Sequence, residues 1–175
     1  MITLVCGRQN SGKSDKAEEL LTASGAVNKY YIATMKVFDK AGEERVKKHR
    51  LKREGKGFIT MEIPYRVDRA LKDIPDPENS AALLECVSNL AGNEMYDDPE
   101  RALSGIASEC ELIALADSVI KDIDVLAGCL RELVIVANIF DEDDGSYDEE
   151  TKVYVRLNNL LTEKIRHKAD RVVDV

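Results

Sequence analysis

The sequence predicts an α/β fold in which a mainly parallel central sheet lies between layers of helices. Short apolar runs alternate along the chain with longer stretches whose apolar residues recur every three or four positions. This alternation is typical of parallel strands joined by crossover helices. A glycine-containing segment, residues 7–14, separates the first apolar run from the first helical stretch.

The strands are expected at apolar runs that are bounded by loop or helix signals. Five runs meet this criterion: Ile2 to Cys6, Lys29 to Ala33, Ala81 to Cys86, Leu133 to Ala137 and Arg171 to Val175. Phe58 to Ile63 is a candidate for a further strand at the edge of the sheet.

The helices are expected where the apolar recurrence follows the helical period. Four stretches show it: Lys13 to Ala23, Gly42 to Glu54, Pro99 to Leu126 and Glu149 to Lys168, the third long enough to divide into two. The two prolines between Ile74 and Asn79 predict a loop, because proline lacks a backbone donor and discourages helix.

The length of 175 residues and the 44% of hydrophobic residues fit one domain, residues 1–175, with an ordinary core. The 25 Lys and Arg against 33 Asp and Glu give a net charge of −8, so no general attraction to nucleic acid or anionic membranes is expected. We expect a cytoplasmic protein, because the opening Met1 to Cys6 lacks the features of a signal peptide. The four scattered cysteines predict neither a zinc site nor a disulfide framework.

The segment after the first expected strand matches the phosphate-binding motif G-x-x-x-x-G-K-[ST], and it reads Gly7-Arg8-Gln9-Asn10-Ser11-Gly12-Lys13-Ser14. Glycines let the backbone curl so that successive N–H groups point at phosphate oxygens, and the following helix adds the positive end of its dipole. Lys13 would add a catalytic charge, and the Ser14 hydroxyl would coordinate Mg²⁺. The motif and its context therefore predict a P-loop NTPase-type three-layer fold that binds a nucleoside triphosphate.

A P-loop enzyme also needs a carboxylate near the metal, normally at the end of a second apolar strand. Glu85 directly follows the apolar run Ala81 to Leu84 and occupies that place. An ordinary glutamate at a strand end is the alternative.

A dense basic segment follows the second expected strand in this otherwise acidic protein, and it contains Arg45, Lys47, Lys48, Arg50, Lys52, Arg53 and Lys56. A solvated charged helix and a nucleotide-binding surface are both compatible with it. His49, one of two histidines, lies among these cations, which disfavour its protonated form and leave the imidazole free as a nucleophile. A surface histidine without a chemical role is the alternative.

Four motifs in this order resemble a known family: the P-loop, Tyr31-Ile32-Ala33-Thr34, Arg45-x-x-x-His49-x-x-x-Arg53 and Leu83-Leu84-Glu85-Cys86-Val87. Over nearly its whole length the chain resembles the bifunctional adenosylcobinamide kinase and adenosylcobinamide-phosphate guanylyltransferase of cobalamin biosynthesis. The resemblance implies phosphorylation of adenosylcobinamide, followed by GMP transfer from GTP through a guanylylated His49.

The resemblance also implies which residues hold the ligands. Besides the P-loop, the expected nucleotide contacts are Ala33, Thr34, Met35, Arg50, Leu51, Lys52, Arg53, Glu62 and Glu85. GTP, ATP and Mg²⁺ are the implied ligands, with Ser14 and Glu85 at the metal. A homo-oligomer is implied as the assembly, with a trimer as the expected form.

The chain departs from the family after Val134 to Asn138. The family continues with a Glu-Val-Gly-x-Gly-Ile-Val-Pro type loop, whereas this chain reads Ile139-Phe140-Asp141-Glu142-Asp143-Asp144-Gly145-Ser146. Two alternatives therefore stay open: a P-loop kinase or nucleotidyltransferase of the same ancestry with another acceptor, and a nucleotide-binding regulatory protein without catalysis.

Overall fold

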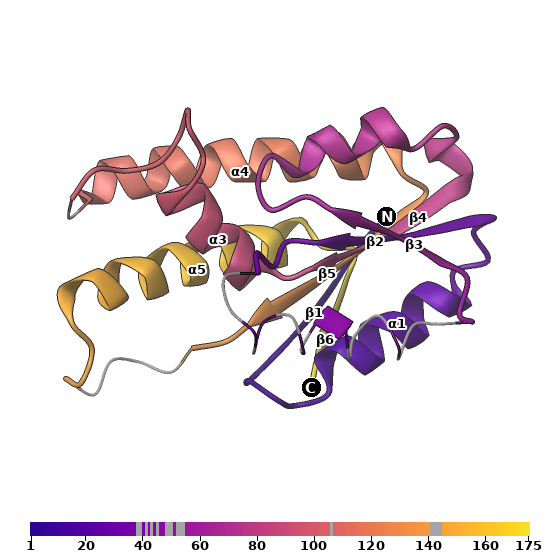
Figure 1. The fold of residues 1–175 in the computed structure, drawn as a ribbon, viewed down its shortest axis with the longest axis horizontal. Helices are drawn as coiled ribbons and strands as arrows, with labels where there is room; N and C mark the ends of the chain where they lie inside the picture. Colours follow the sequence, from indigo (N-terminus) through magenta and orange to yellow (C-terminus); the bar gives the residue numbers. More distant parts are fainter. Residues whose placement is uncertain are drawn as a thin grey trace.

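A computed structural model describes residues 1–37, 40, 42, 44, 46, 47, 51, 55–105, 107–140 and 145–175 of the chain. Its strands form one six-stranded sheet in which every described pairing is parallel (Figure 1). The strands are β1 (Ile2–Gly7), β2 (Asn28–Ala33), β3 (Phe58–Glu62), β4 (Ser80–Glu85), β5 (Glu132–Asn138) and β6 (Arg171–Asp174). Their order across the sheet is β3-β2-β4-β5-β1-β6.

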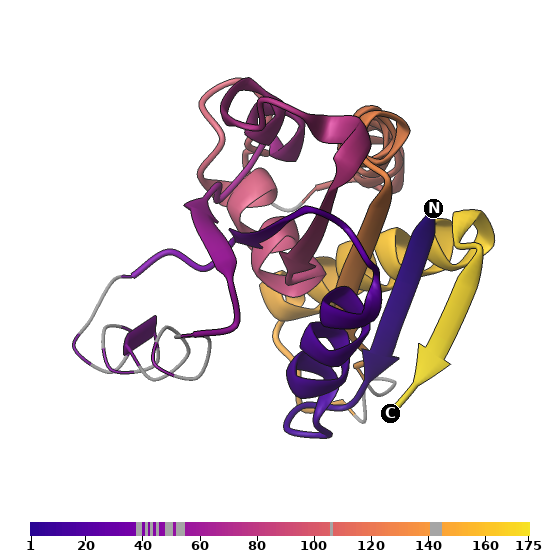
Figure 2. The ribbon, with the colours of Figure 1, turned by 90° about the vertical axis from the view of Figure 1, so that its right-hand side faces the viewer.

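The strands confirm the predicted α/β class, because all six expected runs are strands and their ends differ from the predicted ones by no more than one residue. The candidate edge strand is β3, which pairs with β2 at one edge of the sheet, while β6 forms the other edge beside β1. Figure 2 shows β1 and β6 side by side, with β3 far from them.

The described helices are α1 (Lys13–Ala23), α3 (Val87–Tyr96), α4 (Glu109–Cys129) and α5 (Glu149–Lys168), with the 3₁₀ turns η1 (Val67–Asp73) and η2 (Pro77–Asn79). Both α1 and α5 have the predicted bounds. Most of the expected helix Gly42 to Glu54 lies outside the described residues.

The expected helix Pro99 to Leu126 is wrong at its start, because α4 begins at Glu109. A capping box fixes that start: Ser108 Oγ accepts the N–H of Glu111 (3.4 Å), and the Glu111 carboxylate accepts the N–H of Ser108 (2.8 Å). Helix α3 was not predicted from the sequence. Its asparagines and Gly92 weaken the helical propensity, so its stability depends on the side that it buries in the core.

The core consists of two layers, because successive residues of a strand point to opposite faces of the sheet. In β5, Leu133 and Ile135 belong to the cluster that includes residues of α3, α4 and α5, whereas Val134 and Val136 belong to the cluster that includes residues of α1. Figure 1 shows α4 and α1 on opposite sides of the sheet. Among the described residues no helix has the length and apolar character needed to cross a membrane.

Replacing Ser108 by alanine should lower the free energy of unfolding by about 1 kcal/mol, because the first turn of α4 loses its capping acceptor. Ser104→Ala, at an exposed position in the preceding loop, is the matched control and should leave stability unchanged. Urea denaturation of the two variants and the parent protein measures the difference, and equal midpoints for both variants would contradict the capping role.

Candidate nucleotide-binding site

A pocket of about 600 Å³ lies at the carboxyl edge of the sheet. Five strands contribute residues to its lining at or just after their ends: Gln9 after β1, Ala33 in β2, Glu62 in β3, Glu85 in β4 and Asn138 in β5. Ligands of open parallel sheets bind at this edge, where the loops after the strands converge. The pocket therefore brings together residues from both halves of the sequence.

The turn between β1 and α1 has positive φ angles at two residues. Gly12 has φ +93° and Asn10 has φ +61°, both in the left-handed region that side chains other than those of Asn and Gly rarely occupy. At Gly7 the constraint is contact, because an added Cβ would lie 2.2 Å from the main-chain oxygen of Val175. The structure thus requires glycine at positions 7 and 12 of the motif.

The N-terminus of α1 is suited to an anion. Gly12 is its N-cap and brings no side chain to accept the N–H groups of the first turn, whereas α4 and α5 are capped by the side chains of Ser108 and Asp148. Backbone donors at an uncapped N-terminus and the positive end of the helix dipole both favour a phosphate.

Lys13, the first residue of α1, is buried in the turn, and its Nζ donates to the main-chain oxygen of Arg8. Burial lowers the pKa of the Lys13 ammonium, and the neighbouring acidic groups Cys86 and Glu85 act in the opposite direction. The amino group of Lys13 therefore lies inside the turn, beside the N-terminus of α1.

Glu85 is held on both of its carboxylate oxygens. Ser14 Oγ donates to Oε1, and Tyr31 Oη donates to Oε2 at 2.9 Å. The three side chains come from α1, β2 and β4. A serine hydroxyl and a carboxylate are the hard oxygen donors that Mg²⁺ prefers, so this donor set fits the metal that the sequence motif implies.

Thr34 lies directly after β2 but does not turn its side chain to the pocket. It is fully buried, its Oγ1 donates to the main-chain oxygen of Cys86 (2.9 Å), and it accepts the Cys86 N–H (2.7 Å). Its own N–H donates to the oxygen of Glu85 at 2.9 Å, and the Glu85–Cys86 peptide bond is cis. Thr34 thus braces the end of β2 against the end of β4, while its neighbours Ala33 and Met35 line the pocket.

Of the remaining expected nucleotide contacts that the structure describes, some line the pocket and others do not. Glu62 lines the pocket at the sheet edge, whereas Leu51 is 61% exposed and is not among the described residues that line it. Arg8 and Asn10 are exposed in the P-loop. The expected nucleophile and three expected contacts, His49, Arg50, Lys52 and Arg53, lie outside the described residues.

A second polar group, around Asn138 of the pocket lining, was not predicted from the sequence. Asn138, at the end of β5, donates to Ser88 Oγ (2.9 Å), and its carbonyl accepts the amide of Asn158 from α5 (3.0 Å). Tyr154, one turn earlier in α5, donates to the Ser88 carbonyl at 3.1 Å. An asparagine directly after an apolar strand was the available signal, but its partners lie 20 and 50 positions away.

Comparison with known proteins confirms the family resemblance of the sequence motifs. A family model described as cobinamide kinase / cobinamide phosphate guanyltransferase matches residues 3–175. Among curated proteins no match was found.

Similar solved structures include the flagellar accessory protein FlaH from Methanocaldococcus jannaschii, with a TM-score of 0.45 and 10% identity over 99% of this chain and 70% of that chain. The DnaC helicase loader is similar with a TM-score of 0.40 and 16% identity, over 99% of this chain and 77% of that chain.

Lys13→Ala should reduce the turnover of nucleoside triphosphate by about 100-fold or more, because a charge is lost where negative charge develops on the phosphates. Lys16→Ala is the matched control, since Lys16 pairs with Glu19 (2.9 Å) on the exposed side of α1. Steady-state rates and thermal unfolding of both variants are compared. A Lys13→Ala protein with wild-type turnover would exclude the P-loop as the reaction site.

Tyr31→Phe should raise the Mg²⁺ concentration for half-maximal activity by about 10-fold, because Glu85 loses the donor that orients its Oε2. Tyr30→Phe is the matched control, as Tyr30 belongs to the core cluster on the other face of the sheet. Titrating Mg²⁺ at saturating nucleotide separates the two variants. The same Mg²⁺ requirement in both would show that Tyr31 does not orient the carboxylate.

Proposed function

The chain belongs to the cobinamide kinase / cobinamide phosphate guanyltransferase family, and from this premise we propose that it phosphorylates adenosylcobinamide and then transfers GMP onto the new phosphate. The family match over residues 3–175 is the observation that carries this proposal. As a member of the family the protein is a transferase that uses a nucleoside triphosphate and acts on a cobinamide-type small molecule.

In the proposed complex the triphosphate of GTP or ATP lies on the turn from Gly7 to Ser14. The uncapped first turn of α1 and the buried Lys13 support this placement, because both present positive charge to the same space. Ser14 and Glu85 would hold Mg²⁺, which neutralises phosphate charge when bound. The base then extends along the pocket towards Ala33, Met35 and Glu62.

In the proposed kinase step a hydroxyl oxygen of adenosylcobinamide attacks the γ-phosphorus, and the bond from that phosphorus to the bridging oxygen breaks. The hydroxyl proton is lost to solvent or a nearby base, and the nucleoside diphosphate leaves. Charge spreads over the transferred oxygens during this step. Lys13 and the amides of the P-loop would stabilise that charge without reorganising.

In the proposed guanylyl step a nitrogen of His49 attacks the α-phosphorus of GTP, and pyrophosphate leaves. A phosphate oxygen of adenosylcobinamide phosphate then attacks the same phosphorus, so that the P–N bond breaks and His49 is released. The basic residues around His49 in the sequence support this role, because cations disfavour a protonated imidazole.

A kinase or nucleotidyltransferase of the same ancestry with another acceptor is the second candidate. The observation that favours it is the acidic sequence after Asn138, because this sequence differs from the family pattern directly after the pocket residue that ends β5. Incubation with Mg²⁺, adenosylcobinamide and GTP labelled at the α- or γ-phosphate decides between the two. Transfer of both labels to the cobinamide supports our proposal, whereas nucleotide binding without transfer contradicts it and leaves another acceptor or a non-catalytic role.

His49→Ala should lose covalent labelling of the protein by α-labelled GTP and keep γ-phosphate transfer to adenosylcobinamide, because the P-loop is unchanged. The label on the parent protein should be acid-labile and alkali-stable, as expected of a phosphoramidate. His167→Ala removes the other histidine, which is exposed on α5, and should keep the label. Wild-type labelling of His49→Ala would assign the nucleophile elsewhere.

A further inference from the structure

The strands β2 and β3 separate at a defined point beside the pocket. Their parallel ladder runs to the pair Ala33 and Glu62, and the N–H of Ile63 still donates to the oxygen of Ala33 at 3.0 Å. Among the described residues the ladder does not continue beyond this bond, and Pro64 follows Ile63 in the chain. Beyond this point the carbonyls of Thr34 and Pro64 need donors from another part of the chain.

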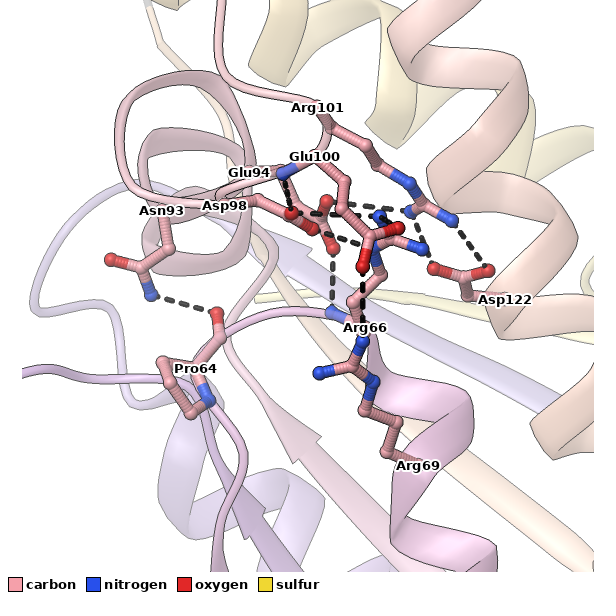
Figure 3. Close-up of polar contacts among 9 residues, drawn as sticks. All are labelled: Pro64, Arg66, Arg69, Asn93, Glu94, Asp98, Glu100, Arg101 and Asp122. Atoms are coloured by element: carbon pink, nitrogen blue, oxygen red, sulfur yellow. Dashed lines mark hydrogen bonds and ion pairs between the residues drawn. The ribbon is translucent and has the colours of Figure 1, made fainter.

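Asn93 supplies both donors. Its Nδ2 donates to the oxygen of Thr34 at 2.7 Å and to the oxygen of Pro64 at 2.8 Å, and its side chain is buried in α3. Figure 3 shows the amide of Asn93 directed at Pro64. One side chain thus uses both of its N–H bonds to hold together the segments that leave β2 and β3.

These two segments are walls of the pocket. Met35 and Val37 line it after β2, and Glu62 and Pro64 line it at the end of β3. Asn93 is not one of the described residues that line the pocket. It contacts the two walls through their main-chain oxygens.

The neighbouring side chain fixes the same segment. Glu94 accepts the main-chain N–H of Arg66 at 2.7 Å, two residues after Pro64, and Arg66 has φ +53°. The guanidinium of Arg66 then pairs with Asp98 (2.5 Å) and Glu100 (2.8 Å) (Figure 3). Burial opposes the charge of Asp98, but the hydrogen bonds from Arg66 and the Glu100 N–H outweigh it and hold the pKa of Asp98 below its ordinary value.

The same network attaches α3 to α4. Arg101 pairs with Glu94 at 3.4 Å and with Asp122 of α4 at 2.5 Å. The segment from Pro64 to Arg66 is therefore held by adjacent residues of a helix that is itself anchored in the core.

The position of this segment along the sheet indicates which part of a nucleotide it meets. From the P-loop at the end of β1, the strand order leads through β5 and β4 to β2 and finally to β3 at the edge. If the phosphates lie on the P-loop, as the proposed function has it, the base lies at the β2 and β3 end, and this inference rests on that proposal.

We propose that Asn93 is a positioning residue that sets the separation of the two pocket walls and thereby the affinity for the base and sugar of the nucleotide. The phosphate end of the site does not depend on it, because the P-loop is held by α1, Glu85 and Tyr31. Loss of Asn93 should therefore weaken GTP binding while a ligand without a base binds as before.

Isothermal titration of GTP and of inorganic tripolyphosphate, each with Mg²⁺, tests the proposal on the full chain. Asn93→Leu, of similar size but without donors, should raise the Kd of GTP at least 10-fold and change that of tripolyphosphate less than twofold. Asn93→Ser keeps one small donor and should give an intermediate Kd for GTP. Asn93→Ser also provides the test of the proposal if Asn93→Leu does not fold.

Ser108→Ala is the matched control for stability, because it removes the cap of α4 and touches neither wall. It should lower Tm and leave both dissociation constants unchanged. A purely structural role of Asn93 would give the same result for the Asn93 variants and would overturn the proposal, as would equal weakening of both ligands. If the parent protein binds neither ligand, the proposed function itself fails.

Discussion

The common direction of the six strands is the constraint on which the candidate site depends. Because β1, β5, β4, β2 and β3 lie side by side and run in parallel, the segments that leave their carboxyl ends meet at one edge of the sheet. Inside the strands the backbone donors and acceptors are used in the ladder. The groups left to bind a ligand are those just beyond the last ladder bond, and they define the pocket.

That edge borders a buried core, so its polar groups must find partners. A carboxylate near the core is costly unless it is hydrogen-bonded, and Glu85 meets this need with Ser14 and Tyr31. Thr34 and Asn93 do the same for main-chain groups at the ends of β2, β3 and β4. The residues that would bind nucleotide are therefore fixed by contacts that also complete the fold.

Much of this architecture was predictable from local patterns. The strands, α1 and α5 follow from hydrophobic periodicity, and the P-loop follows from a motif whose glycines meet a backbone requirement at Gly7 and Gly12. Glu85 was predictable because a strand end has a fixed place in a parallel sheet. The start of α4 could have been predicted too, since the capping-box spacing Ser-x-x-Glu is visible in the sequence as Ser108-Glu109-Cys110-Glu111.

The α/β class, the phosphate-binding turn and the family follow from the sequence alone, because each depends on residues that are neighbours along the chain or on the order of motifs. Only the tertiary fold shows which polar side chains hold the main chain of the pocket walls. Asn93 holds Thr34 and Pro64 from 59 and 29 positions away, and Asn158 holds Asn138 from 20. A lone asparagine in a helix has no periodic signature, so its role is set by the backbone carbonyls that packing brings within 3 Å of its amide.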